Sequence, residues 1–112
     1  MKKLSEYMDV LDDMETYERC KSANQQQVFV FSADWCPDCL YLQGFMESVV
    51  KKHPEIHFIY VNRDEWLDIC EAENILGIPS FLAYRNGIEN GRFVSTKRKS
   101  LQEVESFLGG LV

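Results

Sequence analysis

A continuous apolar run at residues 28–31 (VFVF) restricts the fold of this chain more than any other feature. A strand with no polar residues between its apolar ones is typical of a parallel sheet that is covered on both faces. The run therefore predicts a buried strand over residues 27–32. Residues 37–52, which follow it, have the apolar spacing of an amphipathic helix, and Pro54 closes this helix. A buried strand that leads into a helix predicts an α/β fold.

The remaining segments alternate in the same way. We expect an edge strand near 4–10, helices at 11–21, 64–74 and 100–108, and strands at 57–61, 81–85 and 92–95. The pair Asn86-Gly87 is typical of a hairpin and lies in the loop between the last two strands. This order predicts a central mixed sheet, with parallel core strands and an antiparallel C-terminal hairpin, flanked by helices on both faces. We expect residues 1–112 to form a single domain.

Two cysteines stand at the beginning of the predicted helix 37–52. Pro37 suits the first helical position, where its missing N–H group is no loss, so Cys36 is expected at the N-cap. There the sulfur faces unpaired backbone N–H groups and the positive end of the helix dipole, which favour a thiolate. Cys39 lies one turn later on the same side, within reach of a disulfide bond. The pair predicts reversible thiol–disulfide chemistry.

With these elements in place, the chain resembles the thioredoxin family. The resemblance depends on the WCPDC motif at 35–39 after a buried strand, the segment GIPSF at 77–81, the hairpin and the last helix. It implies the thioredoxin fold and a thiol–disulfide oxidoreductase that reduces protein or small-molecule disulfides. The WCPDC form is similar to thioredoxin-related disulfide reductases of narrower substrate range. No bound cofactor is implied, so electrons must come from an external reductase or thiol.

The resemblance also implies roles for individual residues. Cys36 is expected to be the nucleophile and Cys39 the resolving cysteine. Pro79 is expected to be a cis-proline that faces the disulfide, and Ile78 to offer backbone hydrogen bonds to an extended substrate. The substrate-binding residues expected on this basis are Trp35, Pro37, Asp38, Ile78 and Pro79.

One position departs from the family pattern in a way that affects the mechanism. Many thioredoxins have a buried aspartate six residues before the first cysteine, and here that residue is Val30. The lysine that usually accompanies it falls on Tyr60. Either another group must therefore take the proton of Cys39, or the resolving step must be slow. The two alternatives for such a group are a relay through Asp38, which otherwise serves as a helix-terminus charge, and water entering beside Gly44.

A zinc site is the sharpest competing interpretation of the cysteine pair. Cys36, Cys39, His53 and His57 match the spacing written for zinc fingers. However, a helix over 40–52 would hold Cys39 and His53 about 20 Å apart. Zinc needs all its ligands within about 2.0–2.3 Å of one point, so we expect no metal site.

Two other classes of function remain open. One is a binding or adaptor module that keeps the fold, has little redox activity and uses the surface between Trp35 and Pro79 to hold a partner. The other is a cluster or metal carrier in which Cys36 from two chains ligates the cluster. Reduction of insulin disulfides tests the first alternative, and the absorption spectrum of anaerobically purified protein tests the second.

Three further sequence features have structural interpretations. Cys20 and Cys70 lie on the apolar sides of predicted helices and are expected to be small core residues, with regulatory thiols as the alternative. The basic run 97–99 (KRK) is expected to be a solvated loop. Its alternative role is a positive rim for an acidic partner.

Composition and charge indicate which classes of partner and which cell compartment to expect. Twelve basic and eighteen acidic residues give a net charge of −6, which argues against nucleic acid as a partner. No apolar run is long enough to cross a membrane, and no secretory signal is recognisable at the N-terminus. The cysteine usage fits the cytoplasm, where thiols are reduced at rest. We expect a monomer that acts on disulfide-containing substrates.

Overall fold

The sheet is mixed and has five strands in the order β1-β3-β2-β4-β5. β2 pairs with β3 in parallel and with β4 in antiparallel orientation, while β1 and β5 lie at the edges. The computed structural model describes residues 1–112. The strands are β1 (Asp9–Val10), β2 (Gln27–Ser32), β3 (His57–Asn62), β4 (Ser80–Arg85) and β5 (Ile88–Phe93). This architecture confirms the predicted mixed sheet with a parallel core and an antiparallel hairpin.

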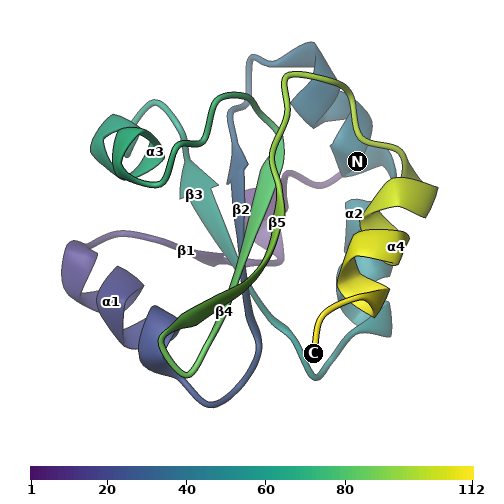
Figure 1. Ribbon diagram of the computed structural model, residues 1–112. Coiled ribbons are helices and arrows are strands. Elements are labelled where there is room, and N and C mark those ends of the chain that lie inside the picture. The colour runs from purple at the N-terminus through teal and green to yellow at the C-terminus, as the bar shows by residue number, and fades with distance from the viewer.

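Helices cover both faces of the sheet. Figure 1 shows α1 and α3 on one side of the strands and α2 and α4 on the other. The helices are the 3-10 turn η1 (Leu4–Glu6), α1 (Met14–Ser22), α2 (Pro37–Lys52), α3 (Leu67–Ala72) and α4 (Leu101–Gly109). None of these helices combines the length and the hydropathy that a membrane-spanning segment requires.

β2 is the centre of the core, because its side chains alternate between the two faces and all six residues are buried. Val28 and Val30 pack into the cluster under α2 and α4. Phe29 and Phe31 pack into the cluster under α1 and α3. The predicted strand 27–32 is therefore confirmed, and its uninterrupted apolar run is explained by two separate cores.

The strand directions bring two distant loops together. Phe31, near the end of β2, pairs with Ser80, the first residue of β4. The segment after β2 and the segment before β4 therefore lie at the same edge of the sheet, which is the upper edge in Figure 1. Cys36 ends the first of these segments, with Cys39 following in the first turn of α2, and Ile78 and Pro79 belong to the second segment.

The C-terminal hairpin differs from the prediction. β5 runs over Ile88–Phe93 rather than 92–95, so Asn86 and Gly87 form a two-residue turn with φ values of 55° and 80°. Positive φ at both central residues is what a type I′ hairpin turn requires. The prediction was wrong because β5 is a largely exposed edge strand whose sequence, IENGRF, lacks the apolar alternation of a strand.

The other boundary differences have local causes. The N-terminal strand contains only residues 9–10, and 4–6 form η1. α1 begins at Met14 because the Asp13 side chain accepts a hydrogen bond from the Thr16 N–H at 2.6 Å. α3 begins only at Leu67, because Asn62 holds the preceding turn through its side chain and carbonyl group. α4 is shifted by one residue from the prediction, because Ser100 is its N-cap and not its first helical residue.

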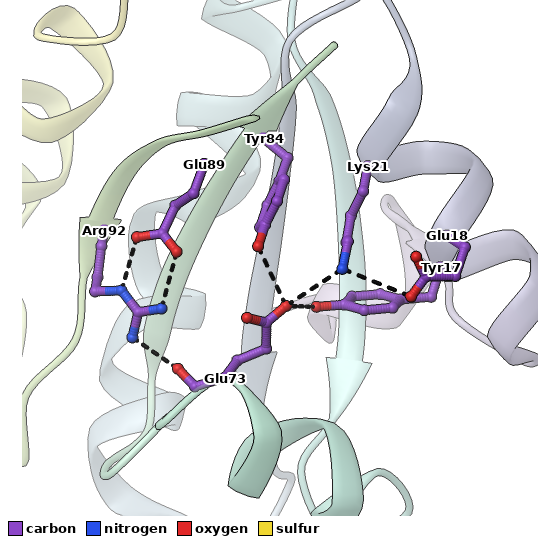
Figure 2. Close-up of polar contacts among 7 residues, drawn as sticks. All are labelled: Tyr17, Glu18, Lys21, Glu73, Tyr84, Glu89 and Arg92. Atoms are coloured by element: carbon purple, nitrogen blue, oxygen red, sulfur yellow. Dashed lines mark hydrogen bonds and ion pairs between the residues drawn. The ribbon is translucent and has the colours of Figure 1, made fainter. Parts of the chain in front are cut away.

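A polar cluster anchors the loop that leads from α3 to β4. Figure 2 shows Glu73, directly after α3, pointing at side chains from α1 and β4. Its carboxylate accepts hydrogen bonds from the Tyr17 and Tyr84 hydroxyls and lies 3.7 Å from Lys21 Nζ. Arg92 of β5 donates to the Glu73 carbonyl oxygen at 2.7 Å. These contacts fix the start of the segment that carries Ile78 and Pro79.

Candidate active site

Cys36 occupies the N-cap of α2, and Pro37 is the first helical residue. Both positions agree with the prediction, because Pro37 needs no hydrogen-bond partner in the first turn. The Cys36 side chain is 7% exposed, which is less than the sequence suggested. Its thiol donates a hydrogen bond to the Ile78 carbonyl oxygen, with Sγ and O 3.8 Å apart. Cys36 therefore faces the segment before β4 and keeps a narrow opening to solvent.

Cys39 lies one turn behind Cys36 and is 0% exposed. The two thiols are within hydrogen-bonding reach of each other. Burial raises the pKa of the Cys39 thiol well above its usual range, although hydrogen bonds with the Ser32 side chain and the Ala33 backbone oppose the rise. Cys39 thus remains a protonated thiol at neutral pH. It needs help from its surroundings to act as a nucleophile.

The segment before β4 lies against Cys36. Its Ile78–Pro79 peptide bond is cis. Pro79 is buried and Ile78 is half-buried. The preceding Gly77 is closed in by the loop between β5 and α4, because a β-carbon at Gly77 would stand 2.3 Å from the Ser95 carbonyl oxygen.

Trp35 forms an exposed apolar rim beside the thiols. The side chain is 60% exposed, and its Nε1–H donates to Asp64 Oδ2 at 2.6 Å. This hydrogen bond is the main cause of a lowered pKa of Asp64. Arg63 lies over the indole ring, 5.9 Å from its centroid. The sequence reasoning missed Asp64, although its place just after β3, beside the end of β2, puts it at the same edge of the sheet.

Asp38 is oriented towards the loop between β5 and α4. Its Oδ1 accepts a hydrogen bond from Arg98 Nε at 2.9 Å. The Arg98 guanidinium also lies over the Tyr41 ring, 4.5 Å from the centroid. The carboxylate thus has a cationic partner outside the cysteine pair, which the sequence did not indicate.

No carboxylate stands at the position of the missing aspartate. Val30 is completely buried and pairs with Tyr60 on β3 and Phe81 on β4. Burial raises the pKa of Tyr60 to about 12, so its hydroxyl stays protonated. Gly44 lies exposed on a continuous α2, with nothing within 4 Å of the position of a β-carbon. Gly44 therefore faces solvent, on a different side of α2 from the buried Cys39.

The basic loop is only partly solvated, which corrects the prediction for residues 97–99. Lys97 and Arg98 are exposed, whereas Lys99 is 1% exposed. Its Nζ donates to the carbonyl oxygens of Ser95 at 2.7 Å and Lys97 at 2.8 Å. Nothing in a run of three basic residues distinguishes the buried one, since burial here depends on how the loop crosses the sheet edge.

The other cysteines and the histidines lie apart from this site. Cys70 is buried and Cys20 is half-buried, both against the cluster under α1 and α3, and burial raises the pKa of each thiol. His53 contacts Glu105 at 2.7 Å, and the other histidine contacts Asp9. No three Cys, His, Asp or Glu side chains converge as metal ligands would.

Comparison with known proteins places this geometry in a family. Residues 8–107 match the family model described as Thioredoxin. Mitochondrial thioredoxin-2 of Schizosaccharomyces pombe is 30% identical over 97 residues, which are 87% of this chain and 73% of that protein. Thioredoxin 1 of Plasmodium falciparum is 30% identical over 83 residues, which are 74% of this chain and 80% of that protein.

Solved structures show the same fold. A crystal structure of thioredoxin from Trypanosoma brucei brucei is 22% identical, covers 97% of each chain and has a TM-score of 0.79. A structure of Plasmodium falciparum thioredoxin is 25% identical, covers 88% of this chain and 97% of its own, and has a TM-score of 0.75.

Proposed function

The chain belongs to the thioredoxin family, and we propose that Cys36 is its nucleophile and Cys39 its resolving cysteine. It is a thiol–disulfide oxidoreductase with protein-disulfide reductase activity. The assignment of nucleophile and resolving cysteine rests on one observation. Cys36 caps α2 at the surface, while Cys39 lies fully buried within hydrogen-bonding reach behind it. A substrate sulfur can approach only the first of the two thiols.

The proposed reaction has two exchange steps. The Cys36 thiolate attacks one sulfur of the substrate disulfide, and the other substrate sulfur leaves as a thiolate that takes up a proton. The Cys39 thiol then loses its proton and attacks Cys36, which breaks the mixed disulfide and releases the second substrate thiol. The protein is left with a Cys36–Cys39 disulfide. Two electrons have passed to the substrate.

The substrate surface surrounds Cys36. Trp35 offers an exposed apolar face, held in place by its hydrogen bond to Asp64. The Ile78 carbonyl oxygen, which accepts from the Cys36 thiol, is a backbone group that an extended substrate would meet as it approaches. The residues proposed to contact substrate are Trp35, Pro37, Asp38, Ile78 and Pro79.

The electron supply lies outside the chain. Thioredoxins act on disulfide substrates and are reduced again by a reductase or a thiol donor. We propose that this chain uses such a donor to reopen the Cys36–Cys39 disulfide after each turnover. The reacting groups in the proposed exchange steps are all sulfur atoms, of Cys36, Cys39 and the substrate.

Insulin-disulfide reduction tests the proposal, with dithiothreitol as the electron donor. We expect turnover by the wild-type protein, its loss in Cys36→Ser, and a much lower rate in Cys39→Ser, where only dithiothreitol can resolve the mixed disulfide. The matched control is Cys20→Ser, which removes a half-buried thiol on the other face of the sheet and should keep the wild-type rate. Turnover by Cys36→Ser at the wild-type rate would contradict the assignment.

The setting of the reaction is part of the proposal. We propose a cytoplasmic, monomeric protein whose residues 1–112 fold as one domain. Support comes from the single sheet, which takes strands from residue 9 to residue 93, and from Cys20 and Cys70, which lie apart from the redox pair. One of the similar proteins is mitochondrial. Cell fractionation tests the compartment, and light scattering after size-exclusion chromatography tests the monomeric state. A single cooperative unfolding transition would support one domain.

A further inference from the structure

The loop between β5 and α4 contains a buried charge that the proposed thiol chemistry does not explain. Lys99 is 1% exposed, whereas lysines are almost never fully buried unless they are paired. The ammonium group is held by the carbonyl oxygens of Ser95 and Lys97 and lies 5.6 Å from the centroid of the Phe93 ring. It takes part in no salt bridge, unlike its neighbour Arg98. Burial of an ammonium without a carboxylate partner is costly, so its position calls for a reason.

The loop that carries Lys99 is attached to both halves of the redox site. The Ser95 carbonyl oxygen packs against Gly77, directly before Ile78. Arg98 is bound to Asp38, between the two cysteines. Both contacts come from residues that precede Lys99 in the sequence, and they hold the loop over the sheet edge where the cysteines stand. Figure 1 shows this loop rising from the end of β5 at that edge and then turning down to α4.

The electrostatic surroundings of Lys99 include both thiols. Burial lowers the pKa of Lys99, and interactions with Asp38, Cys39, Glu103 and Cys36 oppose the fall. The Ser95 carbonyl oxygen that accepts from Lys99 Nζ also packs against Gly77, and the carbonyl oxygen of the next residue, Ile78, contacts the Cys36 thiol.

We propose that Lys99 is a positioning residue of the redox site, whose buried ammonium stabilises the thiolate of Cys39 during resolution and that of Cys36 in the reduced protein. This inference rests on the proposed roles of the two cysteines. It offers a replacement for the aspartate that is absent at Val30. A carboxylate there would accept the Cys39 proton, whereas a cation lowers the free energy of the thiolate and lets the proton pass to solvent. The thiolate then forms the Cys36–Cys39 bond as the bond to the substrate sulfur breaks.

Other titratable and charged groups lie near the thiols and Lys99, and a test must separate their effects from the effect of the Lys99 charge. Asp38 on α2 and Glu103 on α4 act on Lys99 from the two helices, and Tyr60 on β3 acts on Cys39. Lys97 and Arg98 are exposed cations on the same loop. A variant at Lys97 therefore removes the same charge from the same loop at a solvated position, where screening weakens its effect.

The first test compares Lys99→Met with Lys97→Met across pH 5–10. Two rates are followed: alkylation of Cys36 by iodoacetamide, and release of a mixed disulfide preformed on Cys36. For Lys99→Met we expect the alkylation profile to move to higher pH by about half a unit to one unit, and release at pH 7 to slow by about threefold to tenfold. Lys97→Met should leave both profiles in place. A Lys99→Met protein that is less stable but keeps both wild-type profiles would show that Lys99 only braces the loop.

The second test uses the wild-type protein and needs no substrate. Electrostatic coupling is reciprocal, so a thiolate that Lys99 stabilises must also stabilise the Lys99 ammonium. We expect the titration midpoint of Lys99, followed by NMR at its side chain, to be higher in the reduced protein than in the Cys36–Cys39 disulfide form. Equal midpoints would overturn the inference even if Lys99→Met fails to fold. If the midpoints differ but insulin is not reduced, the proposed function fails and the coupling stands.

Discussion

The Ser95 carbonyl oxygen lies 2.3 Å from the position that a β-carbon on Gly77 would occupy. The backbones of two loops therefore touch at the edge of the sheet. One loop carries Ile78 and Pro79, and the other carries Lys99. A shift of the loop between β5 and α4 would therefore displace Gly77 and, with it, the Ile78 backbone that faces Cys36.

Gly77→Ala should destabilise the protein by about 1–3 kcal/mol, because the added methyl group meets backbone atoms of Ser95 and Thr96 that cannot move alone. Urea unfolding measures the change. The matched control is Gly44→Ala on the exposed side of α2, where a β-carbon meets nothing within 4 Å. That substitution should stabilise the protein by up to about 1 kcal/mol, since alanine favours a helix over glycine. Equal losses at the two glycines would contradict the close packing at Gly77.

Cys36 should be the first cysteine to react with iodoacetamide at pH 7. Cys20 is more exposed, but burial raises its pKa and keeps its thiol protonated, and the same holds for Cys70. The helix N-terminus favours the thiolate at Cys36 alone. Mass-spectrometric mapping after brief labelling of the reduced protein provides the measurement. Faster labelling of Cys20 would mean that exposure, not thiolate character, controls reactivity here.

The order of elements around the redox site is predictable because it depends on local chemistry. β2 and α2 have the predicted bounds, since an apolar run ends where a proline can begin a helix. The N-cap position of Cys36 follows from the same proline. β5 was misplaced because a largely exposed edge strand needs no apolar alternation, and its two-residue turn sets where it begins.

The electrostatics of the site are not predictable in the same way. Arg98 reaches Asp38, between the two cysteines, and Lys99 reaches the same edge of the sheet only after β4 and β5 have carried the chain back there. Their roles depend on contacts across about sixty residues, such as the one between Arg98 and Asp38. The single apolar residue Val30 signals that an acid is missing, but no sequence pattern indicates what stands in its place.

Asp38→Asn separates a helix-terminus charge from a proton relay. Asp38 accepts from Arg98 and is partly exposed, so loss of this ion pair should cost about 0.2–1 kcal/mol of stability. Release of the mixed disulfide near pH 7 should slow less than threefold, because the carboxylate is engaged away from Cys39. Stopped-flow measurement of attack and release over pH 5–9 checks both steps. Release that slows tenfold or more while attack is unchanged would establish the relay.

The buried thiol of Cys39 should make stability depend on pH and on redox state. Its pKa is raised in the folded protein, so above about pH 9 the unfolded chain loses this proton while the folded one keeps it. The stability that this group contributes is therefore complete below pH 9 and lost as the pH rises further. The loss is at most about 1.4 kcal/mol per pH unit.

The oxidised protein is the control for this pH dependence, because it has no Cys39 proton but retains Tyr60 and Lys99. Urea unfolding at pH 7, 9 and 10 should show the free energy of unfolding falling more steeply for the reduced form. If the free energy of unfolding falls equally with pH in the two forms, Cys39 titrates alike in the folded and the unfolded chain.

Trapping of the mixed disulfide tests the central claim most directly. Cys39→Ser removes the resolving thiol, so a substrate disulfide added to this variant should remain covalently attached to Cys36 until dithiothreitol releases it. We predict that mass spectrometry of the trapped adduct finds the substrate on Cys36 alone, and that a Cys36→Ser variant forms no adduct. An adduct on Cys20 or Cys70, or a stable adduct with Cys36→Ser, would contradict the account.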